Sequence, residues 1–184
     1  VLVFGSVEIS EMKTIALPSD SATSSTLLRH LISERGLKPS YVEMGPDLEG
    51  MLDMCDGCLL IGDRALESAR AYPDLVRMDL GAEWLEVSGH PMVFGVFAAR
   101  RDSNIADVRD AFTALIGRLT AFENDLRVRE EVIQISSRKS SQTIERLERY
   151  FGEVINRIDP EDMVGLQLFL KDACGMSQDP AMAW

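Results

Sequence analysis

Short apolar runs alternate with amphipathic stretches over the first half of the chain. The runs are too short for helices and are typical of strands buried on both faces. They span residues 1–4, 13–17, 41–44, 58–61 and 75–78. Between them, apolar residues recur at helical spacing, and the predicted helices cover residues 23–35, 47–54, 63–71 and 81–88. This alternation predicts an α/β fold built from right-handed βαβ units on a parallel sheet.

The pattern changes in the second half of the chain. A last apolar run over residues 92–99 predicts one more strand, and from Asp102 onward the periodicity is helical. Helices are expected from about residue 103 to Ile135, in one or two pieces, and over residues 141–158. The final helix has Asp159 as its N-cap, Pro160 in its first turn and Gly175 at its end.

The chain is therefore expected to divide near residue 99. Residues 1–99 would form a compact α/β lobe, and residues 100–184 a helical segment. The apolar stripes of that segment are numerous, and we expect several of its helices to pack on a sheet outside this chain.

The composition narrows the class of partner. The chain has 184 residues, 46% of them hydrophobic, which is enough for one core or for two small lobes. No apolar run approaches the roughly 20 residues of a membrane span. A formal net charge of −11 disfavours binding to nucleic acid and to anionic membranes. An anionic ligand would therefore need a local positive field. The composition does not indicate whether the chain forms an oligomer.

The three cysteines do not indicate a metal or redox site. Cys55 and Cys58 form a C-x-x-C that precedes a strand, whereas a thioredoxin-like motif opens a helix. A zinc site would need further ligands at suitable spacing, and the chain has only two histidines. We expect buried free thiols and no metal. The odd cysteine count is typical of a cytoplasmic protein rather than a disulfide scaffold.

Two strand-to-helix junctions are candidates for a ligand site, at residues 15–25 and 59–66. In open α/β sheets, ligands bind outside the carboxyl ends of the strands, where helix starts present free N–H groups. In the first junction, Ser21, Thr23 and Ser24 offer hydroxyl donors to a carboxylate; the alternative is that they only cap the helix. In the second, Gly62 allows close approach of a ligand, and Asp63 is expected to cap the following helix. Arg64 is either a source of positive charge or a solvated helix residue.

Six segments, spread in order over nearly the whole chain, carry a family resemblance. They are SATS at 21–24, LLIGDRAL at 59–66, DLGAEW at 79–84, GHPMVF at 89–94, residues 149–159, and GLQLF at 165–169. This ordered set resembles the chorismate dehydratase family of the futalosine route to menaquinone.

The resemblance implies a fold and a reaction. The fold is a two-lobed, type II periplasmic-binding-protein-like clamshell that holds its substrate between the lobes. The reaction removes water from chorismate and yields 3-[(1-carboxyvinyl)oxy]benzoate without a metal or organic cofactor. This chain would hold the second lobe and the helices that return into the first lobe, which is largely missing. The substrate-binding residues implied are Ser21, Thr23, Ser24, Gly62, Asp63, Pro91 and Phe94.

Two other functions remain open. One is a non-catalytic solute-binding protein that holds a small anion. The other is 1,4-dihydroxy-6-naphthoate synthase of the same pathway, which carries a histidine-containing segment where this chain has residues 61–64; that difference favours the dehydratase. No catalytic base stands out in the sequence, so we hypothesise that a carboxylate of the substrate accepts the proton.

Overall fold

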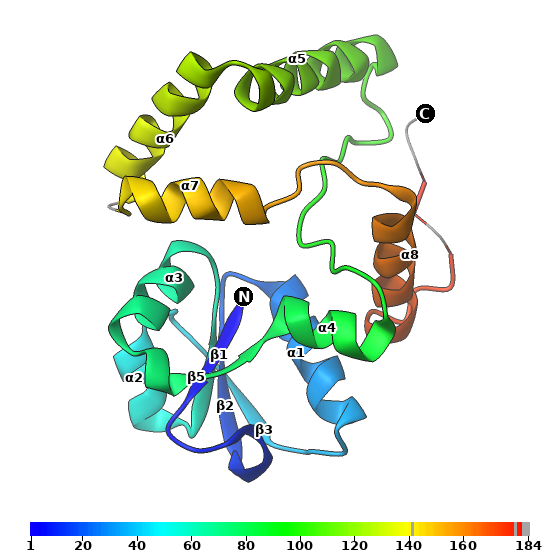
Figure 1. The fold of residues 1–184 in the computed structure, drawn as a ribbon. Helices are drawn as coiled ribbons and strands as arrows, with labels where there is room; N and C mark the ends of the chain where they lie inside the picture. The colour runs from blue at the N-terminus through cyan, green and yellow to red at the C-terminus, as the bar shows by residue number, and fades with distance from the viewer. Residues whose placement is uncertain (141, 179, 182–184) are drawn as a thin grey trace. The chain divides into compact units, whose positions relative to one another are not determined.

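The computed structural model describes residues 1–140, 142–178 and 180–181. They form two compact units, one of Val1–Phe94 with the described residues from Asp159 onward, and one of Gly95–Ile158. The first unit contains a five-stranded sheet in the order β3-β2-β4-β1-β5 (Figure 1). Its strands are β1 (Leu2–Gly5), β2 (Thr14–Pro18), β3 (Ser40–Met44), β4 (Gly57–Leu60) and β5 (Val76–Asp79).

The sheet is mixed, so the expectation of a purely parallel sheet is wrong for one strand. β2 runs parallel to both β3 and β4, whereas β1 runs antiparallel to β4 and β5. The reason lies in the first connection, because residues 6–13 hold only the short turn η1 (Ile9–Glu11). A parallel return needs a crossover of a dozen residues or more, which this segment cannot supply.

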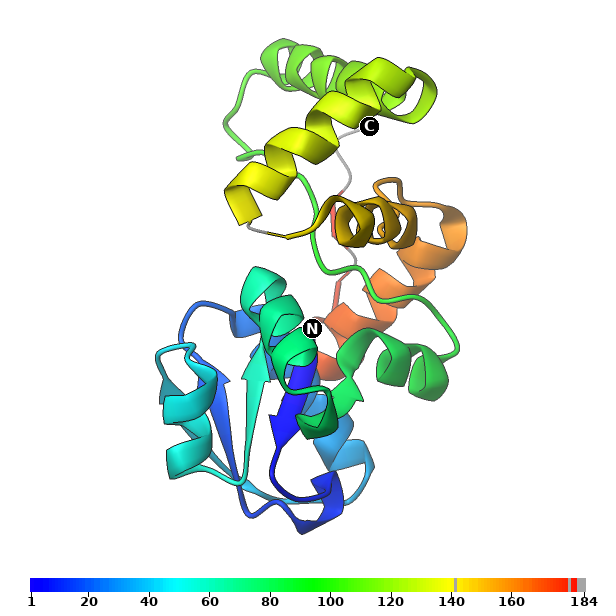
Figure 2. The ribbon, with the colours of Figure 1, turned by 60° about the vertical axis from the view of Figure 1, so that its left-hand side comes forward.

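Helices cover both faces of the sheet (Figures 1 and 2). On one face, α1 (Ala22–Glu34) and α4 (Leu80–Ser88) pack with η3 (Phe169–Ala173). On the other lie α2 (Leu48–Met54) and α3 (Gly62–Ala71). A short turn, η2 (Pro73–Leu75), leads from α3 to β5.

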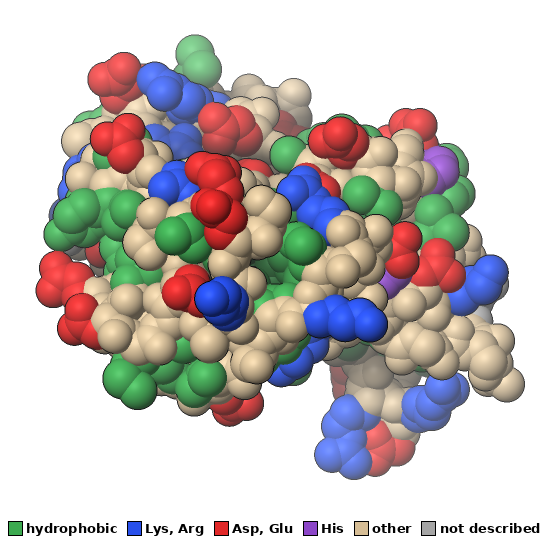
Figure 3. Space-filling model, turned by 90° about the horizontal axis from the view of Figure 1, so that it is seen from below, with side chains coloured by type: hydrophobic (Ala, Val, Ile, Leu, Met, Phe, Trp, Pro, Cys, Tyr) green, Lys and Arg blue, Asp and Glu red, His purple; other side chains and the backbone are tan. Residues whose placement is uncertain are grey.

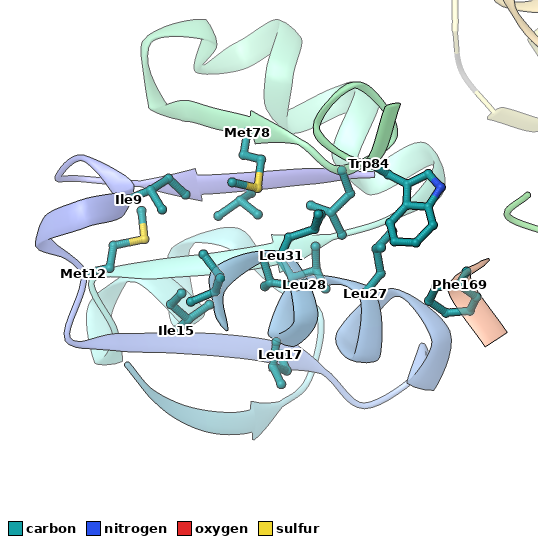
Figure 4. Packing of buried hydrophobic residues seen from close by; sticks show 14 residues of the cluster. Ile9, Met12, Ile15, Leu17, Leu27, Leu28, Leu31, Met78, Trp84 and Phe169 are labelled. Atoms are coloured by element: carbon teal, nitrogen blue, oxygen red, sulfur yellow. The ribbon is translucent and has the colours of Figure 1, made fainter. Parts of the chain in front are cut away.

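Alternate strand residues enter the two cores. Val3, Ile15 and Leu17 contribute to the core beneath α1, whereas Phe4 and Ala16 contribute to the opposite one. Both faces are thus buried, which explains the continuous apolar runs of the sequence. Figure 4 shows the larger cluster, in which Leu27, Leu28 and Leu31 of α1 point toward the sheet.

The C-terminal helix belongs to the first unit. α8 (Pro160–Leu168) begins with a capping box between Asp159 and Asp162, so the predicted N-cap and first-turn proline are confirmed. It continues as the π-helix η3, whose Phe169 meets the ring of Trp84 edge-on, 6.0 Å between centroids. This contact between distant segments is visible in Figure 4.

The described residues of the second unit form three helices, α5 (Ile105–Asn124), α6 (Leu126–Ser140) and α7 (Ile144–Glu153). Phe122 and Phe151 pack with centroids 5.2 Å apart. The helix predicted over residues 141–158 is shorter in the structure, and Ser141 lies outside the described residues. Many apolar side chains of these three helices are exposed; Leu126 at the start of α6, for example, is 76% exposed. Packing of these helices on a further lobe stays a prediction.

The strand predicted over residues 92–99 is wrong. These residues take no regular structure, and the side chains of Val96 and Phe97 are largely exposed. An apolar run forms a strand only where a neighbouring strand accepts and donates its backbone hydrogen bonds. No described strand pairs with this run.

The composition also led to predictions about the cysteines and about membrane-spanning segments. Cys55 and Cys58 are free and buried, as predicted. Cys174 is free but exposed, so the prediction of burial is wrong for this residue. Burial, with the neighbouring Cys55, raises the pKa of the Cys58 thiol to about 12, so it stays protonated. No helix in the described part of the chain is long and apolar enough to cross a bilayer. Figure 3 shows acidic, basic and apolar side chains interspersed over the face seen from below.

Candidate functional site

Four strands end at the same edge of the sheet. β2 is parallel to β3 and β4, and β4 and β5 share a direction because both run antiparallel to β1. Each of the four is followed by a helix, α1, α2, α3 and α4 in turn. We call this the carboxyl edge; it consists of residues 18–24, 44–48, 60–64 and 79–81. Ligands of open α/β sheets bind in this position.

Three of the four helices at the carboxyl edge are capped by side chains. The Ser21 hydroxyl accepts from the Ser24 amide, Asp47 from the Gly50 amide and Asp79 from the Gly81 amide. These caps use one orphan donor each and leave the other first-turn N–H groups pointing out of the edge. Such groups attract anions, and the helix macrodipole adds to their effect.

The first junction places its three hydroxyl residues differently. Ser21 is the N-cap of α1, and its oxygen accepts from the Ser24 N–H at 3.3 Å. Thr23 is exposed in the first turn. Ser24 is buried, 6% exposed. Capping therefore accounts for the oxygen of Ser21, while the hydroxyl of Thr23 lies open to a ligand.

The second junction corrects one expectation. Ile61, not Asp63, is the N-cap of α3, and it provides no side-chain cap. Asp63 lies in the first turn and is exposed. Its negative charge there interacts favourably with the positive end of the helix dipole. Gly62 has φ of +60°, a conformation that glycine adopts without strain. A Cβ at Gly62 would meet nothing within 4 Å, so the backbone here is open to a ligand.

Pro91 and Phe94 lie at opposite ends of α4. Phe94 returns to the carboxyl edge, where its ring would contact a Cβ placed on Gly81 at 3.3 Å. Pro91 follows the far end of α4, and its carbonyl lies directly against Gly165 of α8. A nine-residue helix is about 13 Å long, so the structure brings Phe94 to the edge and leaves Pro91 a helix length away.

An ion pair joins the two junctions. Arg64 Nη1 donates to Asp20 Oδ2 at 2.7 Å. Asp20 lies in the turn between β2 and α1, and Arg64 in the first turn of α3. Sequence reasoning left Arg64 as either a source of positive charge or a solvated residue, and it missed Asp20. The two residues are 44 positions apart, and no sequence pattern signals their contact.

A hollow of about 310 Å³ lies beside Arg64, between the start of α2 and the length of α3. Besides Arg64, three carboxylates line it, those of Asp47, Glu49 and Glu67. An anion would meet more negative than positive charge there. The hollow therefore does not suit a carboxylate ligand. Such a ligand would meet Arg64 where its guanidinium contacts Asp20, which does not line the hollow.

The groups at the carboxyl edge are ones that can position a ligand. Within the described residues, no group of three or more His, Cys, Asp or Glu could hold a metal ion. The carboxyl edge carries aspartates, but it contains no histidine. What it can do chemically is bind an anion through helix starts, hydroxyls and one guanidinium.

Comparison with known proteins places the chain in a family. One curated relative, a chorismate dehydratase from Thermus thermophilus, is 28% identical over 200 residues, covering 98% of this chain and 69% of the relative. The sequence profile of a family described as menaquinone biosynthesis matches residues 1–174. Since that match spans nearly all of the 184 residues, the chain belongs to the menaquinone biosynthesis family.

Proposed function

We propose that this chain is part of a chorismate dehydratase, which removes water from chorismate to give 3-[(1-carboxyvinyl)oxy]benzoate. The observation that carries the proposal is the similarity to a chorismate dehydratase over 98% of the chain. The carboxyl edge supports it, because one side of the sheet presents four helix starts and a guanidinium to a ligand.

The proposed site receives the two carboxylates of chorismate. The start of α1, with the exposed hydroxyl of Thr23 beside Ser21 and Ser24, takes one of them. The backbone at Gly62 and Asp63 approaches the ring closely, and Phe94 offers an apolar wall. Pro91 restricts the backbone at the start of the segment that brings Phe94 back to the carboxyl edge.

The proposed fold is a type II periplasmic-binding-protein-like clamshell. The unit that contains the sheet would be its second lobe, and a further lobe would close over the carboxyl edge. The match covers 69% of the length of the relative, and the helices α5–α7 carry exposed apolar side chains. Both facts support a further lobe.

Dehydration breaks a ring C–H bond and the neighbouring C–OH bond. The electrons of the C–H bond form the new ring double bond, and the base that takes the proton returns it to the departing hydroxide, so that water leaves and the base is regenerated. Because the edge contains no histidine, we assign the proton to the enolpyruvyl carboxylate of the substrate. The protein then acts by holding that carboxylate near the ring proton.

The test uses the complete native reading frame that contains these residues. It is incubated with chorismate, and the aromatic product is sought by mass spectrometry. We expect product from chorismate and none from an analogue that lacks the enolpyruvyl carboxylate. Intact chorismate would contradict the dehydratase and favour a binding protein or the naphthoate synthase, whereas turnover of the analogue would contradict only the assignment of the base.

A matched pair of variants locates the site. Thr23→Val removes the exposed hydroxyl at the start of α1, and we expect KM for chorismate to rise about tenfold, the usual effect of losing a hydrogen bond to a charged group. Ser33→Ala removes an exposed hydroxyl near the other end of the same helix and should leave KM unchanged. Equal KM values for Thr23→Val and the native protein would place the carboxylate elsewhere.

A further inference from the structure

We propose that Arg64 selects ligands with two carboxylates at the carboxyl edge, and that Asp20 holds its guanidinium while the site is empty. The inference rests on the proposed function, because it names the residue that would distinguish a dianion from a monoanion in the same site. Arg64 is then a specificity-determining residue, and Asp20 competes with the ligand carboxylate for its guanidinium.

The first support is that Arg64 has donors to spare. Its Nη1 donates to Asp20 Oδ2 at 2.7 Å, and Asp20 is its only ion-pair partner among the described residues. A guanidinium carries five N–H donors in a planar fork that matches a carboxylate. The Arg64 and Asp20 side chains are 53% and 43% exposed. A ligand can therefore reach the guanidinium without rearrangement of the fold.

The second support is the charge of the carboxyl edge. Its four segments, all of them described, contain the aspartates 20, 47, 63 and 79, and Arg64 is their only cationic side chain. The whole chain carries a formal charge of −11. A dianion that approaches this edge is repelled unless a full positive charge meets it, because helix starts supply only partial charges.

The third support is where the ion pair holds Arg64. Asp20 immediately precedes Ser21, the N-cap of α1, so the guanidinium is tethered to the junction that would receive the first carboxylate. Arg64 is thereby placed for a second carboxylate of the same small molecule. Exposed ion pairs contribute little to stability, so a ligand carboxylate can displace Asp20 from the guanidinium at small cost.

The test measures affinity by calorimetry on the native polypeptide. The probes are 3-[(1-carboxyvinyl)oxy]benzoate and its two monomethyl esters. We expect Arg64→Gln to weaken the diacid at least about tenfold, and to leave unchanged the monoester whose blocked carboxylate is the one that Arg64 binds. Asp20→Asn should tighten the diacid several-fold, because the guanidinium no longer has a competitor.

The double variant separates this exchange from a general charge effect. If Asp20 acts through Arg64, Asp20→Asn has no effect once Arg64→Gln is present, whereas simple repulsion by Asp20 would persist. The matched control is Arg100→Gln, which removes the exposed pair with Asp102 outside the edge and should leave affinity unchanged. Thermal unfolding checks that every variant is folded.

The possible outcomes separate the two proposals. Native protein that converts chorismate, with additive effects of the two variants or no effect of Arg64→Gln, overturns this inference and leaves the dehydratase in place. Native protein that binds neither chorismate nor the diacid overturns both.

Discussion

At the scale of single residues, Asp56 shows how one carboxylate connects two strands. Its Oδ2 accepts from the amides of Lys13 and Thr14, at 2.8 and 2.9 Å, and from the Thr14 hydroxyl at 3.0 Å. The Asp56 amide donates back to that hydroxyl. Asp56 thereby joins the turn before β4 to the start of β2, and these bonds hold the pKa of its carboxyl below the usual value.

We expect this carboxylate to make stability depend on pH. The folded pKa lies below the unfolded value of about 3.9, so the contribution is fully present above about pH 4 and is lost as the pH falls through the folded pKa. Asp56→Asn should therefore lower the urea midpoint at pH 7, and its difference from the native protein should shrink toward pH 3. Asp53→Asn, at an exposed position of α2, is the control. A difference independent of pH would refute the assignment.

At the scale of elements, the fit of α8 against the end of α4 depends on one glycine. A Cβ at Gly165 would collide with the carbonyl of Pro91. The backbones at the collision belong to segments that are distant in the chain. Trp84 of α4 and Phe169, which follows α8, contact each other in the core and hold these segments together. The sequence shows Gly165 only as an unexplained glycine within a helix.

We expect Gly165→Ala to destabilise the protein by about 1–3 kcal/mol, because overpacking forces a shift of backbone. At this chain length the melting temperature should fall by about 2–4 °C for each kcal/mol. Gly152→Ala is the matched control, since it also lies in a helix but its Cβ would meet nothing within 4 Å. That variant should gain up to about 1 kcal/mol from better helix propensity. Equal melting temperatures for the two variants would contradict the close contact.

At the scale of the whole molecule, the two units differ in how much they bury. In α1, Leu27, Leu28 and Leu31 are fully buried, whereas none of the residues of α5, all of which the structure describes, is buried. Local stability follows the apolar area that an element buries. The stability of the folded chain therefore comes mainly from the unit that contains the sheet.

Hydrogen exchange followed by mass spectrometry checks this difference on the chain of residues 1–184. Amides of α5 should exchange well before those of α1, because opening α5 exposes little additional apolar surface. Equal and strong protection of the two helices would mean that another surface, such as a second copy of the chain, covers α5.

The sequence by itself determined most elements of the sheet-containing unit and the two junctions. Burial on both faces produces apolar runs, and a helix with one buried face produces a period of 3.6, so strands and helices can be recognised locally. The cap at Asp159 was equally readable, because capping depends on adjacent residues. The run over residues 92–99 misled for the same reason, since its composition is local whereas a strand needs a partner.

The tertiary structure alone decided which segments meet. It reversed β1 relative to its neighbours, returned α8 and η3 to the first unit, and paired Arg64 with Asp20 across 44 positions. Each of these depends on the path of the chain in space, and local patterns of hydrophobic and polar residues carry no record of that path. The physical reason is that an apolar side chain is stabilised by burial in any core, so its pattern in the sequence does not specify its neighbours. Those neighbours are determined only when the layers of the fold have assembled.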